Sequence, residues 1–359
     1  MLTYVIRRLL LMIPTLIGMT LVLFVIMAAS PGGVGASLRS AEGNMRPEQR
    51  REIEAYLKHR YGLDQPLYRQ YLRWLNHVSP IGFKDVGPGW PASLPFGFKA
   101  VDLGESLQRR TSVLSLVEEA LPVTLLLNVL STPLIYVIAV TSGIYAARRR
   151  GAFMDMASGV TLIALWSLPV MCVGVLMLGY LANKDYWQSF PVGGLHDTVS
   201  DSMAFLPHWI GGHFQRGWLL DTLWHLVLPV VCLSYGGFAF LSKLMRAAML
   251  ENLAADFART ARAKGLKENV VVMRHVLRNS ILPLITVGAS VLPSLLGGAL
   301  IVESIFSING MGRLMIDAIF AKDQELVMSE TYVIGIVSLL SLLVADLCYA
   351  LADPRVSYE

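Results

Sequence analysis

Few residues of this chain have the spacing that catalysis or metal binding requires. The sequence contains no GxxxxGK[ST] phosphate loop, no HExxH zinc motif and no GxSxG nucleophile motif. The three cysteines lie in apolar runs without a CxxC pair, and His208 with His213 is the nearest approach to ligand spacing. We interpret that pair as loop polarity, and we predict no metal site and no catalytic site in this chain.

A basic loop over residues 243–278 carries the clearest chemical signal. It holds eight Lys or Arg residues against three acidic ones. Helical spacing gives it one apolar face, formed by Leu250, Leu253, Ala254, Phe257, Ala258 and Ala261. Gly265 is expected to end this helix, and a second helix is expected to begin near Glu268. Such a basic amphipathic helix suits either an anionic lipid surface or a partner protein, and periodicity alone leaves both open.

Long apolar segments must position this loop. Hydrophobic residues make up 54% of the 359 residues and charged residues only 16%, whereas soluble domains carry about 25% charged residues. A run of about 20 apolar residues crosses a bilayer as a helix. We predict six such helices, at Leu9–Ala29, Ala120–Ala147, Met156–Asn183, Thr222–Ser242, Asn279–Val302 and Thr331–Ala345, the last extended to Ala352 if Asp346 is tolerated. The candidates for kinks are the prolines inside or at the ends of these runs: Pro14, Pro133, Pro169, Pro229, Pro283 and Pro293.

Positive charge indicates which loops face the cytoplasm. Arg7 and Arg8 precede the first apolar run, which at 21 residues is too long for an ordinary cleaved signal, and 148–150 follow the second. Together with the loop 243–278 they predict a multi-pass protein with both termini inside. Two long segments, 31–119 and 184–221, are then extracytoplasmic. The first is expected to contain a helix at Pro47–Leu75 and a loop at Pro80–Gly97.

Several motifs resemble one family of membrane proteins. The stretch RTARAKG at Arg259–Gly265, followed by RHVLRN at Arg274–Asn279, resembles the cytoplasmic coupling loop of the dipeptide/oligopeptide branch of ABC importer permeases. The general permease pattern is EAA, three residues, Gly, nine residues and then I-x-L-P. Ala261 and Gly265 agree with it, whereas Arg259 and Thr260 depart from it and Arg278 stands where the pattern has proline. This chain also resembles the same branch at further motifs. In chain order these are YVIRRLLLMIPTLIG (Tyr4–Gly18), YGLDQP (Tyr61–Pro66), DLGESL (Asp102–Leu107), LPVTLLL (Leu121–Leu127), Glu303, Phe306, Asn309–Gly312, Asp323 and DPR (Asp353–Arg355). Within the branch, the likeness is greatest to permeases of microcin C-type peptide importers.

The resemblance implies an all-α, type I ABC importer permease fold with six transmembrane helices. The expected domains are a first transmembrane helix (1–30), an extracytoplasmic segment (31–119), a transmembrane type-1 domain (120–352, with the coupling loop and the insertion 184–221) and a cytoplasmic tail (353–359). The residues expected to contact an ATPase are Phe257, Arg259, Thr260, Ala261, Arg262, Ala263, Lys264 and Gly265.

The resemblance also implies partners and a location. It implies a bacterial inner-membrane permease subunit that takes up peptides with a second homologous permease, two ATPase subunits and an extracytoplasmic solute-binding protein. Nucleic acid is not an expected partner, since membrane topology accounts for the basic charge. This chain would bind no cofactor, because ATP and Mg would be bound by the ATPase subunits. Few charges line the predicted spans, and no substrate-contacting residue can be named.

Three other functions remain to be weighed. A self-contained carrier or channel would be expected to place acidic groups in mid-span. An intramembrane enzyme would need a catalytic constellation within the spans, and none is evident. An ABC permease for a non-peptide solute, such as a metal chelate, would share every motif above and differ only in its substrate.

Overall fold

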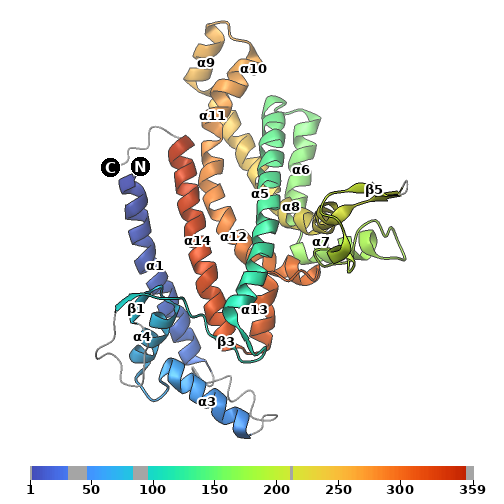
Figure 1. Cartoon of the computed structure of the whole chain (residues 1–359). Coiled ribbons are helices and arrows are strands. Elements are labelled where there is room, and N and C mark those ends of the chain that lie inside the picture. Colours follow the sequence, from blue (N-terminus) through green and yellow to red (C-terminus); the bar gives the residue numbers. More distant parts are fainter. Residues whose placement is uncertain (1, 31–46, 84–95, 211–212, 353–359) are drawn as a thin grey trace. The chain divides into compact units, whose positions relative to one another are not determined.

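The described chain is mainly helical. The computed structural model describes residues 2–30, 47–83, 96–210 and 213–352, which contain the helices drawn in Figure 1. Three two-stranded antiparallel ladders accompany the helices: β1 (Ile81–Phe83) with β2 (Phe96–Phe98), β3 (Glu105–Ser106) with β4 (Thr111–Ser112), and β5 (His208–Ile210) with β6 (His213–Gln215). The interpretation of Pro80–Gly97 as a loop is therefore wrong at both ends of the segment. The middle of that segment (84–95) and the expected tail (353–359) lie outside the described residues.

Helices long and apolar enough to cross a bilayer overlap the predicted spans, although the one expected at Asn279–Val302 is found at Glu268–Gly288. Among the described residues, five helices are long and apolar enough to cross a bilayer, and a bent pair of helices gives a sixth. The five are Val5–Ala29, Val113–Arg148, Gly217–Ala254, Glu268–Gly288 and Gln324–Leu347. The contacts divide the chain into two compact units: unit 1 comprises Met1–Leu121 and Leu314–Val337, and unit 2 comprises Pro122–Arg313 and Ser338–Glu359.

Unit 1 contains α1 (Leu2–Ala29), α3 (Pro47–Tyr61), α4 (Leu67–Val78), most of α13 (Met311–Phe320) and the first half of α14 (Gln324–Ala352). The single helix predicted at Pro47–Leu75 is wrong: Gly62, at φ 65°, ends α3, and Pro66 immediately precedes α4. The centre of this unit is Trp74, which is 0% exposed. Its ring lies 6.5 Å from that of Phe24 and 6.3 Å from that of Tyr332. The unit thus has its own aromatic core.

Motifs that are far apart in the sequence meet in unit 1. Arg60 forms a buried ion pair with Glu325, which also accepts a hydrogen bond of 2.5 Å from the Tyr61 hydroxyl. Burial raises the pKa of Tyr61, so the phenol keeps the proton that it donates. Gly104 lies against this pair at φ 85°, and a Cβ added there would overlap the Glu325 carboxylate. Ser106 similarly donates to Asp323 at 2.5 Å. The YGLDQP and DLGESL motifs are therefore parts of one junction with the segment around Asp323.

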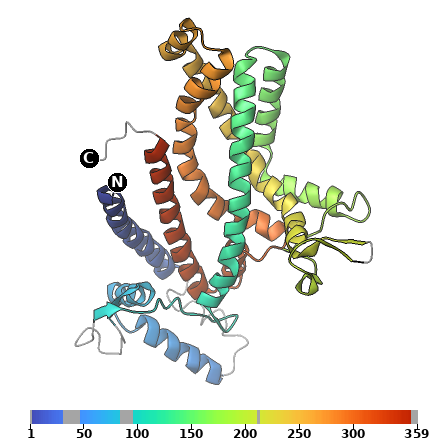
Figure 2. The same ribbon diagram turned by 45° about the horizontal axis from the view of Figure 1, so that its top comes forward.

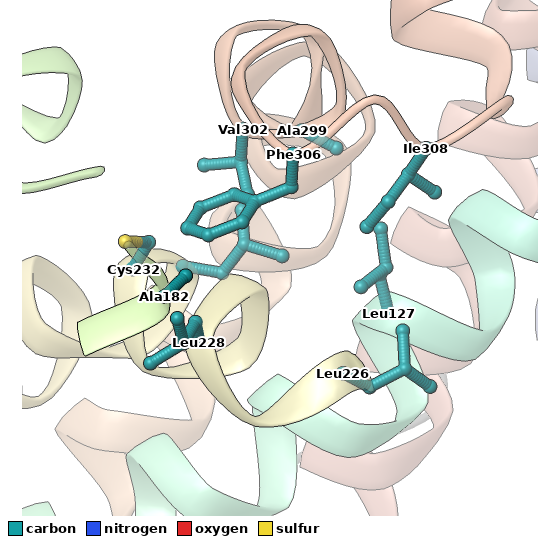
Figure 3. Close-up of a cluster of buried hydrophobic side chains, with 10 residues drawn as sticks. Leu127, Ala182, Leu226, Leu228, Cys232, Ala299, Val302, Phe306 and Ile308 are labelled. Carbon is teal, nitrogen blue, oxygen red and sulfur yellow. The ribbon is translucent and has the colours of Figure 1, made fainter. Parts of the chain in front are cut away.

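Unit 2 is built around α8 (Gly217–Ala254). This helix packs against α6 (Phe153–Ser167), α7 (Val170–Met177) and α12 (Leu282–Ile305), while α5 (Val113–Arg148) contributes Leu127 to the core they share. Figure 3 shows Leu228 and Cys232 of α8 close to Val302 and Phe306 at the end of α12. The π-helical turn η2 (Leu178–Ala182) contributes Ala182, and a 3₁₀ turn η3 (Ser200–Ser202) lies in the insertion that follows.

The third predicted span is not one straight helix. Met156–Asn183 corresponds to α6 followed by α7 and η2, with a bend of 94° between them. Pro169 explains the bend, because it lacks an N–H group and disfavours helical backbone at Leu168, which is extended at φ −78°, ψ 126°. The Tyr235 hydroxyl on α8 donates a hydrogen bond of 2.6 Å to the Leu168 carbonyl. The expectation that Pro169 marks a kink is confirmed, and the fold supplies a partner for the carbonyl next to it.

The loops of unit 2 gather at two ends as the charge pattern predicts. Both views place the α5–α6 turn at the same end as α9 (Asp256–Ala263) and α10 (Glu268–Val270) (Figures 1 and 2). A hydrogen bond of 2.6 Å from Arg148 to Asn269 joins these two basic segments. At the other end, the insertion after η2 meets the end of α12, where the Gly194 N–H donates to the Phe306 carbonyl at 2.9 Å.

Candidate functional site

The basic loop forms an elbow between two long helices; we use this name for residues 245–284. The chain leaves α8 at Ala254, takes an extended conformation at Ala255 (φ −68°, ψ 154°) and re-enters helix at Asp256. The return path consists of α10, a π-helical stretch η4 (Val271–Val276), α11 (Leu277–Ser280) and α12. The predicted single apolar stripe is therefore split: Leu250, Leu253 and Ala254 close α8, and the rest belongs to α9.

The end of α9 lies where the sequence predicts it. Lys264 is the C-cap and Gly265 follows at φ 76°. The Gly265 N–H donates to the Arg262 carbonyl at 2.9 Å, and the Leu266 N–H donates to the Ala261 carbonyl at 3.4 Å. These two bonds form a Schellman motif, in which a left-handed residue satisfies the last carbonyls of a helix. The interpretation of Gly265 as the helix stop is confirmed.

A closely packed base supports the elbow. The base cluster consists of Ala147, Met245, Met249, Ala258, Ala261, Val271, Val272, Val276 and Leu284, each at most 6% exposed. These residues come from α5, α8, α9, η4 and α12. Full burial of one valine or methionine side chain contributes about 1.5–3 kcal/mol, and such interiors transmit displacement because they compress little. The base cluster therefore packs the elbow closely against its two long helices.

Arg262 closes the elbow with polar contacts. Its Nε and Nη2 donate to the two carboxylate oxygens of Glu268 at 3.0 and 2.9 Å, and its Nη1 donates to the Leu253 carbonyl at 3.1 Å. The bonds to Glu268 raise the pKa of the Arg262 guanidinium. The side chain thus joins α9 to α10 and to the end of α8. Because Arg262 already has an acidic partner within the chain, it is a weaker candidate than Lys264 for pairing with another protein.

Two hydroxyl and amide contacts tie the descending and ascending helices below the tip. The Asn252 amide of α8 donates to the Ser280 hydroxyl of α11 at 3.2 Å. That hydroxyl lies 2.9 Å from the Val276 carbonyl and 3.2 Å from the Ala248 carbonyl of α8, which share its single hydrogen. Ser280 is fully buried. The two arms of the elbow are therefore joined to each other by hydrogen bonds as well as through apolar packing.

The tip of the elbow is exposed; by the tip we mean residues 257–267 apart from the buried Ala258 and Ala261. Seven of the eight residues predicted to couple to an ATPase belong to it: Phe257, Arg259, Thr260, Arg262, Ala263, Lys264 and Gly265. Ala261 is 6% exposed and belongs to the base cluster. Phe257, which the helical pattern assigned to the apolar face, is 38% exposed. Leu266, at 40% exposed, was not singled out from the sequence, because the motif was taken to end at Gly265.

The tip carries four cations, of which Arg262 and Arg259 have acidic partners within the chain. Arg259 meets Asp256 at 3.5 Å, but the side chains are 71% and 96% exposed, and such surface pairs contribute about 0–1 kcal/mol. Lys264 and Lys267 have no ion-pair partner among the described residues. The tip thus presents cations beside exposed apolar side chains, a combination that suits an acidic groove with an apolar floor.

Two buried carboxylates of unit 2 were not assigned a role from the sequence. Asp155 of α6 accepts two bonds of 2.7 Å from Arg246 of α8, and a third of 3.0 Å from the Gly151 N–H. Glu303 accepts from Thr124 at 2.7 Å and from the Arg313 N–H at 3.0 Å. Asp155 fixes the α5–α6 turn to α8, whereas Glu303 fixes the start of α13 to α5. Among the described residues, no group of three or more His, Cys, Asp or Glu side chains is placed to hold a metal ion.

Comparison with protein families identifies the chain. Residues 139–358, which include the whole elbow, match the family described as "Binding-protein-dependent transport system inner membrane component". The chain belongs to this family. Residues 1–128 match the companion N-terminal family, "Binding-prot-dependent transport system membrane comp, N-term". As a binding-protein-dependent transport component, the protein is a multi-pass inner-membrane protein that works within a transport system.

Curated relatives match this transport component over its full length. It is 33% identical over 359 residues to the oligopeptide transport system permease protein AppB of Bacillus subtilis, covering 100% of both chains. It is 30% identical to the inner membrane ABC transporter permease protein YejB of Escherichia coli O157:H7, covering 99% of both, and 32% identical to the di/tripeptide transport system permease protein DppB of Pseudomonas aeruginosa, covering 100% of both. The predicted family is confirmed. YejB is among the relatives at an identity close to the others, so the comparisons show the wider peptide-permease group.

Proposed function

We propose that this protein is the permease subunit of an ATP-driven ABC importer for peptides, and that the tip of its elbow docks into one of two cytoplasmic ATPase subunits. The observation that carries the proposal is the contrast between an exposed, cationic tip and a rigid base. Relatives named for oligopeptide, dipeptide and tripeptide transport support the choice of substrate. The side chains of the tip make few contacts with their own chain, so a partner protein is their natural use.

The proposed mechanism transmits movement through the elbow. When the two ATPase subunits close on ATP and Mg, the groove that holds α9 moves, and the tip moves with it. The base cluster and the Ser280 contacts then carry this displacement into α8 and α12, because a packed body rotates as a whole. Rotation of these helices against a second homologous permease would exchange inward for outward access to the peptide path. A solute-binding protein would deliver the peptide from outside.

This mechanism requires the end bearing α9 to be cytoplasmic. Lys and Arg accumulate in the elbow and at 148–150, and the bond between Arg148 and Asn269 brings these two segments together. The insertion after η2 lies at the other end of unit 2 and would be extracytoplasmic. We infer from the charge pattern that both termini are cytoplasmic.

Crosslinking of the intact transporter tests the proposal. A photo-crosslinking residue at Lys264 is expected to capture an ATPase subunit that carries a Walker motif. The same residue at Trp187, which is 74% exposed and lies beyond η2, is the control and is expected not to capture it. Mass spectrometry of chains that co-purify in mild detergent should find the ATPases and a second permease. Transport by this chain alone, or capture from position 187 but not from 264, would contradict the proposal.

Uptake assays test the substrate separately. Proteoliposomes that contain the complete transporter and its binding protein should accumulate labelled peptides when ATP is supplied. Competition by a metal chelate but not by peptides would show an ABC permease for another solute, and would leave the docking role of the elbow intact.

A further inference from the structure

A cavity of about 590 Å³ lies in unit 2 between α5, α6 and α8, next to the elbow. Its polar side contains Ser142, Asp155, Ser158, Ser242, Lys243 and Arg246. These residues lie where the helices approach the α5–α6 turn, at the end of unit 2 that bears α9 (Figure 1). The cavity is not part of the proposed ATPase-docking tip.

Most polar groups of the cavity already have partners within the chain. Asp155 and Arg246 form a two-bond pair at 2.7 Å. The Ser142 and Ser242 hydroxyls bond each other at 2.7 Å. Lys243 is the exception, since it is exposed and has no ion-pair partner among the described residues. Lys243, Arg246 and Asp155 together carry a net charge of +1, so the cavity offers one cation and few free hydrogen-bonding groups.

The wall beside the cavity is apolar and uncovered by the chain. Phe153, Met156, Val160 and Ile163 follow one face of α6 at intervals of three and four residues, and they are 76%, 61%, 68% and 51% exposed. Met156, Val160 and Ile163 also line the cavity. The stripe leads from the polar end toward the middle of a membrane-spanning helix.

We propose that this cavity binds one anionic phospholipid, with its headgroup at Lys243 and its acyl chains along the α6 stripe. A cation at the membrane surface with an apolar wall running inward complements a molecule that is an anion at one end and hydrocarbon at the other. A passing peptide suits the site less well, because the hydroxyls of Ser142, Ser158 and Ser242 already donate hydrogen bonds within the chain. The carbonyl groups of a peptide would therefore find few free donors there. The inference requires only that the chain spans the membrane, so it stands or falls apart from the identity of the transported solute.

Lipid retention by the intact transporter tests this site. The chain, purified with its partner subunits, is placed in nanodiscs of phosphatidylcholine with a minor fraction of phosphatidylglycerol, and the retained phosphatidylglycerol is counted by native mass spectrometry. Lys243→Gln should weaken retention about fivefold, the effect of one lysine at an anionic surface. Arg274→Gln is the matched control, because it removes an exposed cation at the same end but outside the cavity, and retention should stay at the wild-type level.

A second variant tests the cavity independently of charge. Gly159 lines the cavity, and a Cβ added there meets nothing within 4 Å, so Gly159→Leu places a side chain in the cavity from an unobstructed position. This variant should also lose the bound phosphatidylglycerol while keeping the thermal stability of the wild type. Wild-type retention by both Lys243→Gln and Gly159→Leu would overturn the proposal. Displacement of the lipid by inorganic phosphate or by transported peptide would overturn it as well, since it would mark a free-anion site or the peptide path.

Discussion

Gly265 offers the sharpest test of whether the tip meets a partner. It has a positive φ of 76°, and a Cβ added there would meet nothing within 4 Å in this chain. A non-glycine residue in this conformation costs about 1–2 kcal/mol, which changes the population of the helix-ending conformation about 5- to 30-fold. Asparagine tolerates the left-handed region better than alanine does, although it is larger. Backbone strain and side-chain size therefore rank these two substitutions in opposite orders.

We expect size to decide the outcome. Gly265→Ala should lower thermal stability more than Gly265→Asn, because it carries the greater backbone strain. Gly265→Asn should nevertheless transport less peptide per ATP hydrolysed, because its side chain projects from the tip toward the ATPase groove. Gly265→Trp should abolish transport and leave ATP hydrolysis uncoupled from it.

The assay compares three quantities in one preparation of the reconstituted transporter: ATP-dependent peptide uptake, ATPase rate and melting temperature. If transport follows stability, with Gly265→Ala the poorer of the two, Gly265 serves only to end α9. Wild-type uptake by Gly265→Trp would refute a closely fitted socket at this position.

Three further substitutions probe contacts that lie within unit 1 or within unit 2. Glu268→Gln breaks the two-bond pair with Arg262 and should lower the free energy of unfolding by only about 0.5–1 kcal/mol, because both groups are partly exposed. Peptide transport per ATP should nevertheless fall by more than this small loss of stability explains, because α9 loosens. Uptake and denaturation measured on the same preparation check this. Tyr235→Phe leaves the Leu168 carbonyl without its hydrogen bond at the 94° bend, and should destabilise the protein by about 1–3 kcal/mol in thermal denaturation in detergent. Gly104→Ala drives a methyl group into the buried ion pair of unit 1 and should reduce the folded fraction in size-exclusion chromatography more than Tyr235→Phe does.

Hydropathy and glycine conformation account for most of what the sequence could predict. The six apolar runs correspond to helices because length and apolarity are local properties of the chain. Gly265 was predictable as the end of α9 for the same reason, since a left-handed residue requires little from the rest of the fold.

The sharpness of the bend at Pro169 is a feature that local sequence signals do not predict. Pro133 and Pro229 also lie inside predicted spans, yet α5 and α8 continue through them. At Pro169 the chain turns through 94°, and the carbonyl beside it is bonded by a tyrosine 67 residues away. Whether a proline bends a helix so sharply thus depends on partners that sequence spacing does not reveal.

Which side chains of the elbow are buried and which are exposed could not be predicted, for a related reason. An unbroken apolar pattern from Leu250 to Ala261 suggests one helix, but Ala255 is extended and divides it. Neither glycine nor proline marks this position. The break turns Phe257 outward and leaves Ala258 and Ala261 in the base, so the residue contacts follow from tertiary packing rather than from periodicity.

The elbow separates residues by what their own chain requires of them. Replacing Ala258 or Val271 would damage the base and therefore the fold, whatever the protein does. Lys264 and Leu266 contribute little to folding, since they are exposed and make few contacts within the chain. An exposed apolar side chain and an unpaired cation at the tip do not stabilise the fold through contact with water. Their usefulness depends on a second surface, and in the proposed mechanism the base cluster carries a force applied at that surface into the membrane helices.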